Sequence, residues 1–287
     1  MDKRFVLLGH SGFLGSALLK LLQSQEAEVH CFSRSTLDLR QLDALGQLDH
    51  LVDRSATVIF ASALTPDKGA TLEVLQSNLD MAMNMARYFE ARAPGQCVYL
   101  STDAVYSPDV SPITEETPVE PSNFNALGKY LGECVLRRVL DANATPLLII
   151  RLVPLYGSGD THGSYGPNQF VRSILRERTV RLFGGGEEQR DHLYVEDAAR
   201  GILDLVKRQR AGTYNLAMGN SRSFAGIVEI LRHVVPYPFS VVSVPRKTAI
   251  THRWFDTTKL FLSNPAFKFT SLEEGLRAYW IAEQSRR

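Results

Sequence analysis

The residues of this chain with the clearest chemical role are three glycines near its start, Gly9, Gly12 and Gly15. They lie between a hydrophobic run, FVLLG, and a segment with the apolar pattern of a helix. In such a turn the first glycine permits a tight bend, the second lets the backbone approach a diphosphate, and the third lets helix and strand pack closely. The helix directs its free N–H groups and positive dipole end at the phosphates. The turn predicts a dinucleotide-binding site, with further contacts from Ser11, Phe13 and Leu14.

A second group of polar residues follows the next hydrophobic segment, EVHCFS. An acidic residue there would bind the ribose hydroxyls of NAD, but this chain has Ser33 and Arg34. A guanidinium suits a 2′-phosphate, so NADP is favoured over NAD, unless Arg34 is only a solvated surface side chain. Asp38 either meets the adenine amino group or serves as a turn residue. Ala61 and Ala63, at the end of ATVIFAS, complete the predicted cofactor contacts.

Strands alternating with helices are predicted to position these residues. The hydrophobic patterns indicate strands at 5–9, 28–33, 56–62, 96–101 and 146–152, and helices at 12–23, 71–91 and 125–140. Continuous apolar runs such as FVLLG are typical of parallel strands that are buried on both faces. The alternation implies βαβ units, and therefore an α/β fold with a doubly wound parallel sheet of the Rossmann type.

The texture of the chain changes after Gly157. A loop rich in Gly, Ser and Pro leads to a helix at about 169–178, a glycine turn, an apolar strand in FSVVSV and a last helix that opens on a capping box at Ser271 and Glu274. We expect a smaller substrate-binding lobe set over the strand ends. The predicted division is an NAD(P)-binding Rossmann domain at 1–157, to which 191–217 returns, and a substrate lobe formed by 158–190 and 218–287.

The composition is that of a soluble globular protein: 287 residues, 44% apolar, 22% charged, with net charge +1. The absence of a long basic run argues against nucleic acid as a partner, and no apolar stretch approaches the ~20 residues that span a bilayer. Cys31, Cys97 and Cys134 are expected to be small core residues in a reducing cytoplasm. His162 and His192 have no metal-ligand spacing, so we expect no metal.

Several further motifs occur in a fixed order along the chain: STDAVY at 101–106, Lys129 followed by Gly-Glu, RLVPLYG at 151–157, RDHLYVED at 190–197, YNLAMGN at 214–220 and DTTKL at 256–260. With the glycine turn, they make the chain resemble the extended short-chain dehydrogenase/reductase family of nucleotide-sugar epimerases, dehydratases and reductases. The likeness covers essentially the whole length. The Thr-Asp pair and the segment LDLR are most similar to the dTDP-4-dehydrorhamnose reductase branch.

The resemblance implies a catalytic set made of Thr102, Asn125 and Lys129. In the family, a tyrosine four residues before the lysine exchanges a proton with a sugar hydroxyl. The lysine lowers the pKa of that tyrosine and holds the nicotinamide ribose, while a Ser or Thr binds the same oxygen. Thr102 and Lys129 fit the last two roles, but Asn125 occupies the tyrosine position. An amide can orient a sugar oxygen but cannot exchange its proton, so impaired catalysis is expected.

Other tyrosines are weak substitutes for the missing one. Tyr130 follows the lysine directly, and on a helix its side chain points about 100° away from the lysine. Tyr106 is nearer in the family pattern, and Tyr165 lies in a loop over the expected site. A structural role is favoured for all three tyrosines. An inactivating change at Asn125 remains a further interpretation.

The resemblance also implies a site for the nucleotide sugar. Arg190 and Arg253 stand where the family binds the substrate diphosphate, although either could form a surface ion pair instead. Asp103 is a further expected substrate contact. Ala104 replaces a glutamate acid of the 4,6-dehydratases, which argues against that reaction, and Pro154 replaces an asparagine that helps to seat the nucleotide sugar.

Two functions from different classes follow. The first is an NAD(P)-dependent oxidoreductase or epimerase acting on a nucleotide-linked sugar, which the glycine turn, Thr102 and Lys129 favour. The second is a degenerate, non-catalytic member that binds dinucleotide as a sensor or regulatory subunit, which Asn125 favours. The resemblance further implies a homodimer through the helices at 71–91 and 125–140. The predicted location is the cytoplasm.

Overall fold

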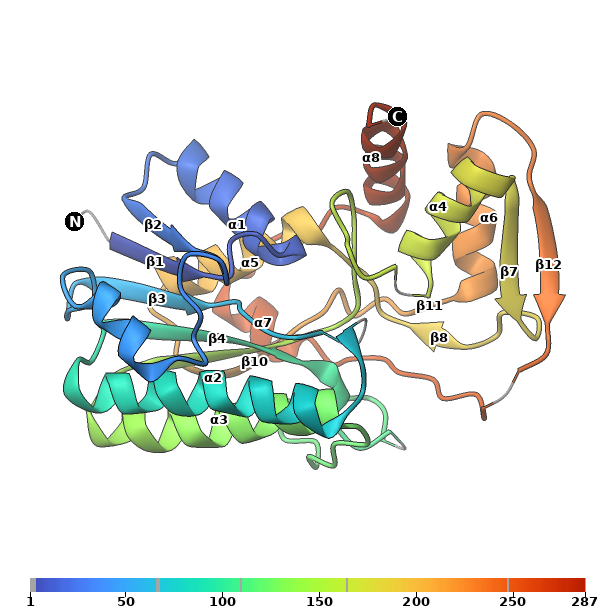
Figure 1. The fold of residues 1–287 in the computed structure, drawn as a ribbon. Helices are drawn as coiled ribbons and strands as arrows, with labels where there is room; N and C mark the ends of the chain where they lie inside the picture. The colour runs from blue at the N-terminus through green and yellow to red at the C-terminus, as the bar shows by residue number, and fades with distance from the viewer. Residues whose placement is uncertain (1–3, 66–67, 109, 164, 247, 287) are drawn as a thin grey trace.

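A six-stranded parallel sheet forms the centre of the computed structural model, which describes residues 4–65, 68–108, 110–163, 165–246 and 248–286. The strand order is β10-β5-β4-β3-β1-β2 (Figure 1). The strands are β1 (Arg4–Leu8), β2 (Val29–Phe32), β3 (Ala56–Phe60), β4 (Gln96–Thr102), β5 (Leu147–Leu152) and β10 (Gly212–Leu216). From β1 the chain adds β2 on one side and β3 on the other, so the topological switch point lies between β1 and β3, where sheets of this kind bind ligands.

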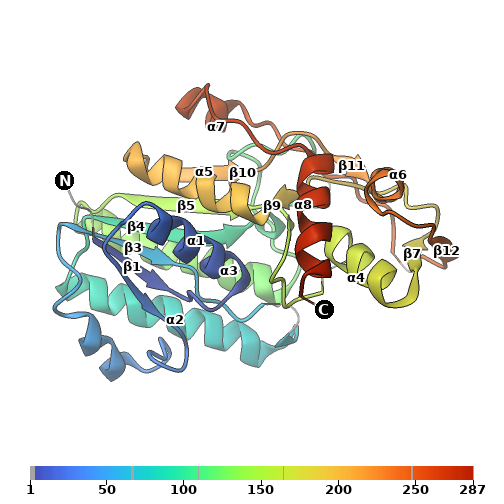
Figure 2. The ribbon, with the colours of Figure 1, turned by 90° about the horizontal axis from the view of Figure 1, so that it is seen from above.

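Helices cover both faces of the sheet. The helices α2 (Leu72–Ala91) and α3 (Phe124–Ala142) lie side by side on one face, and α1 (Phe13–Ser24) and α5 (Val195–Lys207) lie on the other (Figures 1 and 2). Alternate residues of each strand supply the two cores: Val6 and Val58 face α2 and α3, whereas Leu7 and Ile59 face α1 and α5. Burial on both faces explains why the strands are continuous apolar runs.

The remaining elements gather at the carboxyl ends of the strands. They include two parallel strands, β7 (Thr179–Phe183) and β12 (Ser240–Val244), with the helices α4 (Pro167–Glu177), α6 (Phe224–Val234) and α8 (Leu272–Gln284) (Figure 1). Two short pairs lie between them and the sheet: β6 (Leu155–Tyr156) with β9 (Leu193–Tyr194), and β8 (Gln189–Arg190) with β11 (Arg222–Ser223). The helix α7 (Thr258–Ser263) contacts β10.

The predicted α/β class and doubly wound parallel sheet are confirmed, and each predicted strand and helix is present with ends shifted by a few residues. The capping box that opens α8 is also present, with both Ser271–Glu274 hydrogen bonds made. Short elements without a long apolar period were not predicted, among them the 3-10 helices η1 (Leu42–Leu48) and η3 (Asp103–Val105). The domain boundaries stay a prediction.

The prediction for the cysteines was only partly right. Cys97 is buried in β4 and Cys31 is half-buried, but Cys134 is exposed. Cys134 lies on α3, whose buried positions include Leu136 and Leu140, and the helical period turns its side chain away from that face. In the described part of the chain, no helix is both long and apolar enough to cross a membrane.

Candidate functional site

The turn between β1 and α1 leaves no room for side chains at two of its glycines. Gly9 has a φ of +97°, and a Cβ there would lie 2.7 Å from the backbone nitrogen of Ser62. A Cβ on Gly15 would overlap the carbonyl oxygen of Gly9, so the helix packs directly on the turn. At Gly12 the nearest atom to a Cβ is the Gly9 carbonyl oxygen at 3.4 Å. The protein itself therefore leaves space beside Gly12.

The same turn presents free hydrogen-bond donors. Gly12 is the N-cap of α1 and offers no side chain to the first N–H groups of the helix, whose first turn contains no acidic residue. These groups and the helix dipole suit the phosphates of a dinucleotide. Phe13 and Leu14 bury their side chains in the core, so a contact from either to a cofactor would use the backbone. The geometry fits a bound diphosphate.

A cavity opens beside this turn, at the switch point of the sheet. Its lining brings together most of the predicted cofactor contacts with apolar residues that the sequence analysis did not select. The lining residues are Gly9, Ser11, Gly12, Arg34, Leu37, Asp38, Leu39, Arg40, Ala61, Ser62, Ala63, Leu64 and Met81. Ser33 lies just outside this set, and its hydroxyl is 2.8 Å from that of Ser35. A lining that combines charged and apolar groups suits a nucleoside with a phosphate.

The charged groups in the lining of this cavity are two arginines around one carboxylate. Arg40 donates to both oxygens of Asp38, with Nε at 2.9 Å from Oδ1 and Nη2 at 2.5 Å from Oδ2. This hydrogen bonding lowers the pKa of Asp38 to about 2. Arg34 is 69% exposed at the side chain, with Nε 4.0 Å from Asp38 Oδ2. The main visible role of Asp38 is thus to hold Arg40; its contact with adenine stays a prediction.

The predicted catalytic residues lie where β4 ends and α3 begins. Lys129 donates from Nζ to the carbonyl oxygen of Leu100 at 2.7 Å, and Nζ is 4.9 Å from the centroid of the Tyr99 ring. Burial lowers the pKa of Lys129 to about 8, against the opposing effect of the Glu133 carboxylate. Thr102 accepts the backbone N–H of residue 104 through Oγ1 at 3.2 Å. These contacts hold Thr102 and Lys129 at neighbouring positions around the end of β4.

Asn125 begins the same helix, one turn before the lysine. Its Nδ2 donates to the carbonyl oxygen of Gly69 at 3.3 Å. Its Oδ1 is buried and has no hydrogen-bond partner among the described residues. An unpaired acceptor in this position can receive a hydrogen bond from a ligand hydroxyl, but the amide has no proton to exchange near neutral pH.

The three tyrosines considered as substitutes have other contacts. Tyr106 is buried and donates to Asn215 Oδ1 at 2.6 Å, and burial raises its pKa to about 12. The hydroxyl of Tyr165 accepts the backbone N–H of Phe183 at 3.1 Å. The hydroxyl of Tyr130 interacts with Cys134, which contributes to a raised pKa. Each contact is compatible with a structural role.

A buried ion pair supports the catalytic end of β4. Arg151 on β5 donates to Glu133 on α3 through Nε at 3.1 Å and Nη2 at 2.7 Å. Ser101, the residue before Thr102, donates to the same carboxylate at 2.5 Å. The pair thus ties β4, α3 and β5 together directly behind the site. The sequence showed Glu133 only as part of a motif, and its partner lies 18 positions away.

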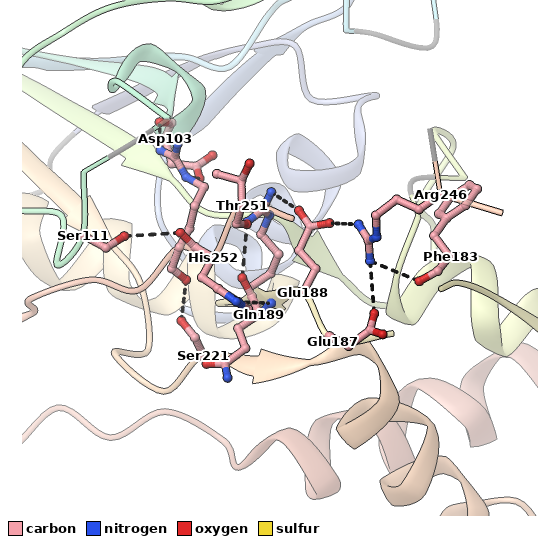
Figure 3. Close-up of polar contacts among 12 residues, drawn as sticks. Asp103, Ser111, Phe183, Glu187, Glu188, Gln189, Ser221, Arg246, Thr251 and His252 are labelled. Atoms are coloured by element: carbon pink, nitrogen blue, oxygen red, sulfur yellow. Dashed lines mark hydrogen bonds and ion pairs between the residues drawn. The ribbon is translucent and has the colours of Figure 1, made fainter. Parts of the chain in front are cut away.

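The arginines predicted to bind a diphosphate are paired with groups of the protein itself. Arg253 donates from Nη2 to the backbone carbonyl of Asp103 at 2.7 Å, and its Nε is 3.4 Å from Asp103 Oδ2. Arg190 binds the carboxylate of Glu188 and the carbonyl of Thr251. Figure 3 shows Asp103, Glu188 and Thr251 in this network. Two guanidinium groups are therefore present in this network, with acceptors that a diphosphate would have to replace.

A third arginine in this region was missed from the sequence. Arg246 donates to Glu188 at 2.7 Å and lies 3.6 Å from Glu187 (Figure 3). It lines a cavity of about 410 Å³ together with aromatic and charged residues: Pro154, Tyr165, Phe183, Glu188, Arg190, His192, Phe224 and Thr248. Only the spacing of basic residues in the sequence could have indicated that Arg246 belongs to this site. The carboxylates that it contacts, Glu187 and Glu188, come from another segment of the chain. No cluster of three potential metal ligands occurs among the residues described.

A doubly wound sheet with a glycine turn at its switch point defines a dinucleotide-binding protein of the Rossmann class. The model of the NAD dependent epimerase/dehydratase family matches residues 5–217, and the chain belongs to this family.

Three proteins of known name are similar over nearly the whole chain. GDP-L-fucose synthase of Sinorhizobium fredii is 24% identical over 294 residues, which cover 96% of this chain and 93% of that protein. The structure of UDP-N-acetylglucosamine 4-epimerase from Methanobrevibacter ruminantium has a TM-score of 0.88 at 21% identity, covering 100% and 99% of the two chains. RMD from Pseudomonas aeruginosa, complexed with NADPH, has a TM-score of 0.87 at 22% identity, covering 99% and 100%. At these identities the structural likenesses show the fold alone.

Proposed function

We propose that this protein is an NAD(P)-dependent enzyme that reduces, oxidises or epimerises a nucleotide-linked sugar. One observation carries the proposal. The glycine turn follows β1, and Thr102 ends β4, so both lie at the carboxyl edge of one parallel sheet, where Lys129 is also anchored. A dinucleotide with its diphosphate on the turn can extend along this edge toward the lysine.

The cavity that Arg190 and Arg246 line supports a nucleotide sugar as the substrate. Arg190 and Arg246 line a cavity whose other walls carry three aromatic rings, and Arg253 lies beside Asp103. Guanidinium groups suit a diphosphate, and aromatic rings suit a base. The names of the relatives, a GDP-L-fucose synthase and a UDP-N-acetylglucosamine 4-epimerase, support the same substrate class.

NADP is the favoured cofactor. Arg34 and Arg40 bring two guanidinium groups to the cavity against one carboxylate, Asp38, and the remaining positive charge suits a 2′-phosphate. That RMD was solved with NADPH supports this choice.

The nicotinamide, when bound, supplies or accepts the hydride. The protein residues then have separate tasks. Lys129 would hold the nicotinamide ribose, Thr102 would bind the reacting sugar oxygen, and the unpaired Oδ1 of Asn125 would accept a neighbouring sugar hydroxyl. Ala104 offers no acid for a 4,6-dehydration, so reduction or epimerisation is favoured. We place the protein in the cytoplasm as a homodimer that pairs through α2 and α3.

The second candidate function is a non-catalytic sensor or regulatory subunit. Asn125 favours it, because an amide cannot exchange a proton with the sugar. Such a protein would retain the dinucleotide cavity and bind cofactor without turnover.

Calorimetry with NADPH and NADH, followed by turnover assays with a panel of nucleotide sugars, tests both functions. The proposed enzyme binds NADPH more tightly than NADH and turns over at least one nucleotide sugar. Tight cofactor binding without turnover of any member of the panel would favour the sensor. If neither cofactor bound, both functions would be excluded.

A further inference from the structure

The proposed chemistry requires a proton that position 125 cannot supply. The residue that follows Thr102 in the sequence has a carboxyl group, and this group contacts the Thr102 hydroxyl. Asp103 is only 8% exposed and is the first residue of η3, immediately after β4. Its Oδ1 receives the Thr102 hydroxyl at 3.5 Å. This distance is long for a hydrogen bond, but such contacts in ligand-free enzymes often tighten when the substrate binds.

We propose that Asp103 is the proton donor and acceptor of this site and acts through the Thr102 hydroxyl, in place of a side chain at position 125. The inference rests on the proposed function, because it assigns the proton step of that reaction. Thr102 can do this because a hydroxyl donates one hydrogen bond and accepts another at the same time.

The surroundings of Asp103 favour a carboxyl group that can change its charge. Burial raises its pKa, whereas Arg253 and Arg190 oppose that shift, as does the Thr102 hydroxyl; the net direction is upward. The carboxyl group of Asp191 interacts electrostatically with that of Asp103. Arg253 Nε lies 3.4 Å from Oδ2, which is not the oxygen that receives the Thr102 hydroxyl. The carboxyl group can therefore carry a proton on Oδ1, and Arg253 can stabilise the carboxylate left behind.

The step balances for the reduction of a sugar ketone. A reduced nicotinamide, when bound, would supply a hydride to the carbonyl carbon, and the carbonyl π electrons would move to oxygen. That oxygen takes the proton of the Thr102 hydroxyl, which takes the proton of Asp103 Oδ1. The products are the alcohol, the oxidised nicotinamide, Thr102 unchanged and Asp103 as a carboxylate beside Arg253. Oxidation follows the same path in reverse.

Two further buried titratable groups lie close to the end of β4: Glu133, which is bound by Ser101 and Arg151, and Lys129. The Nζ of Lys129 donates to the carbonyl of Leu100 and lies over the Tyr99 ring, which positions it along β4 before Thr102. No described contact joins either group to the Thr102 hydroxyl. The hydrogen-bond path from Thr102 to a titratable group therefore leads to Asp103.

The first test needs neither cofactor nor substrate. The ¹³C carboxyl resonance of Asp103, assigned by its loss in Asp103→Asn, is titrated in the ligand-free protein. We expect a midpoint above that of Asp256, whose pKa is held low by hydrogen bonds from Thr258. Arg253→Gln should move the Asp103 midpoint further upward. A midpoint at or below that of Asp256 would overturn the proposal.

The second test is kinetic and uses the full chain with NADPH and the sugar found in the panel. Asp103→Asn should lower the rate of reduction by about 10²–10⁴-fold, the usual contribution of a general acid, and remove the alkaline fall of the wild-type pH profile. Asp103→Ala should regain activity with added formate. Thr102→Val should lose activity like Asp103→Asn. Glu116→Gln, which changes an exposed carboxyl in a turn, is the control and should not change the rate.

Asn125→Tyr in the Asp103→Asn background tests the exchange of roles. The new phenol would lie one turn before Lys129 and should raise the rate at least tenfold over Asp103→Asn alone. If the wild-type enzyme turns over and the rate of Asp103→Asn is within threefold of the wild-type rate, this inference is wrong and the proposed function is retained. The absence of turnover in every form would overturn both. Thermal unfolding of each variant distinguishes loss of the fold from loss of proton transfer.

Discussion

The glycine turn and the sugar-side cleft, by which we mean the cavity of Arg190 and Arg246 with the neighbouring Arg253, are built from different parts of the chain. The turn offers backbone: Gly9 and Gly15 exclude side chains, and the start of α1 offers N–H groups with no partner in the helix. The cleft offers side chains, and its arginines are paired with Asp103, Glu188 and backbone carbonyls. The turn is thus ready for a ligand, whereas the cleft must exchange internal ion pairs for contacts with one. We infer that the turn supplies affinity and that the cleft supplies selectivity.

The largest expected effect on ligand binding comes from a change in the turn. Gly12→Asp places a side chain and a negative charge where a diphosphate would lie, and dinucleotide affinity should fall by at least about 100-fold, or ~2.7 kcal/mol. The fold should survive, because a Cβ on Gly12 comes no closer than 3.4 Å to its nearest neighbour. Calorimetry measures the affinity. Gly46→Asp is the control, since a Cβ there has nothing within 4 Å, and unchanged binding by Gly12→Asp would contradict our interpretation of the turn.

The next effect concerns the support of the catalytic side. Arg151→Met leaves the carboxylate of Glu133 buried without its partner, and the free energy of unfolding should fall by about 3–5 kcal/mol. Urea denaturation followed by circular dichroism measures this loss. Adding Glu133→Gln should recover part of it, because the uncompensated charge is then removed. A loss below 1 kcal/mol would show that the pair is not needed to hold β4, α3 and β5.

A smaller effect tests the buried lysine. The pKa of Lys129 is lowered to about 8 from 10.5, so the unfolded chain binds more protons than the folded chain between these values. Wild-type stability should therefore rise, relative to Lys129→Met, by about 2–3 kcal/mol as the pH increases from 7 to 10.5. Urea denaturation of both proteins across this range measures the difference. A difference that does not change with pH would mean that folding leaves this pKa unshifted.

The smallest expected effect is on the affinity of the cofactor cavity for NADP. Arg34→Ala should weaken NADP binding by about 1.5 kcal/mol, the low end for a hydrogen bond to a charged group, because the side chain is 69% exposed. NAD binding should change little, since it lacks the 2′-phosphate. Competition calorimetry with both cofactors gives the two affinities. Equal losses for NAD and NADP would remove the argument for NADP.

The sequence by itself determined the class of fold and the position of the glycine turn. Both depend on local spacing: apolar runs mark the strands, the helical period marks α1, α2 and α3, and three glycines in seven residues mark the turn. Such patterns are readable because the interacting residues are close in the chain. Cys134 shows where this reading fails, since an apolar context does not reveal which face of a helix is buried.

Only the tertiary structure decided which charged side chains meet. Arg40 joins the cofactor cavity because Asp38 holds it there. Asp103 meets Arg253 across 150 positions of the chain. Spacing in the sequence does not predict a pair such as Asp103 and Arg253. The two partners come from different elements, and the distance between them depends on the packing of the whole fold. The role assigned here to Asp103 therefore comes from its neighbours in space, whereas the motif around it could only show that a carboxylate follows Thr102.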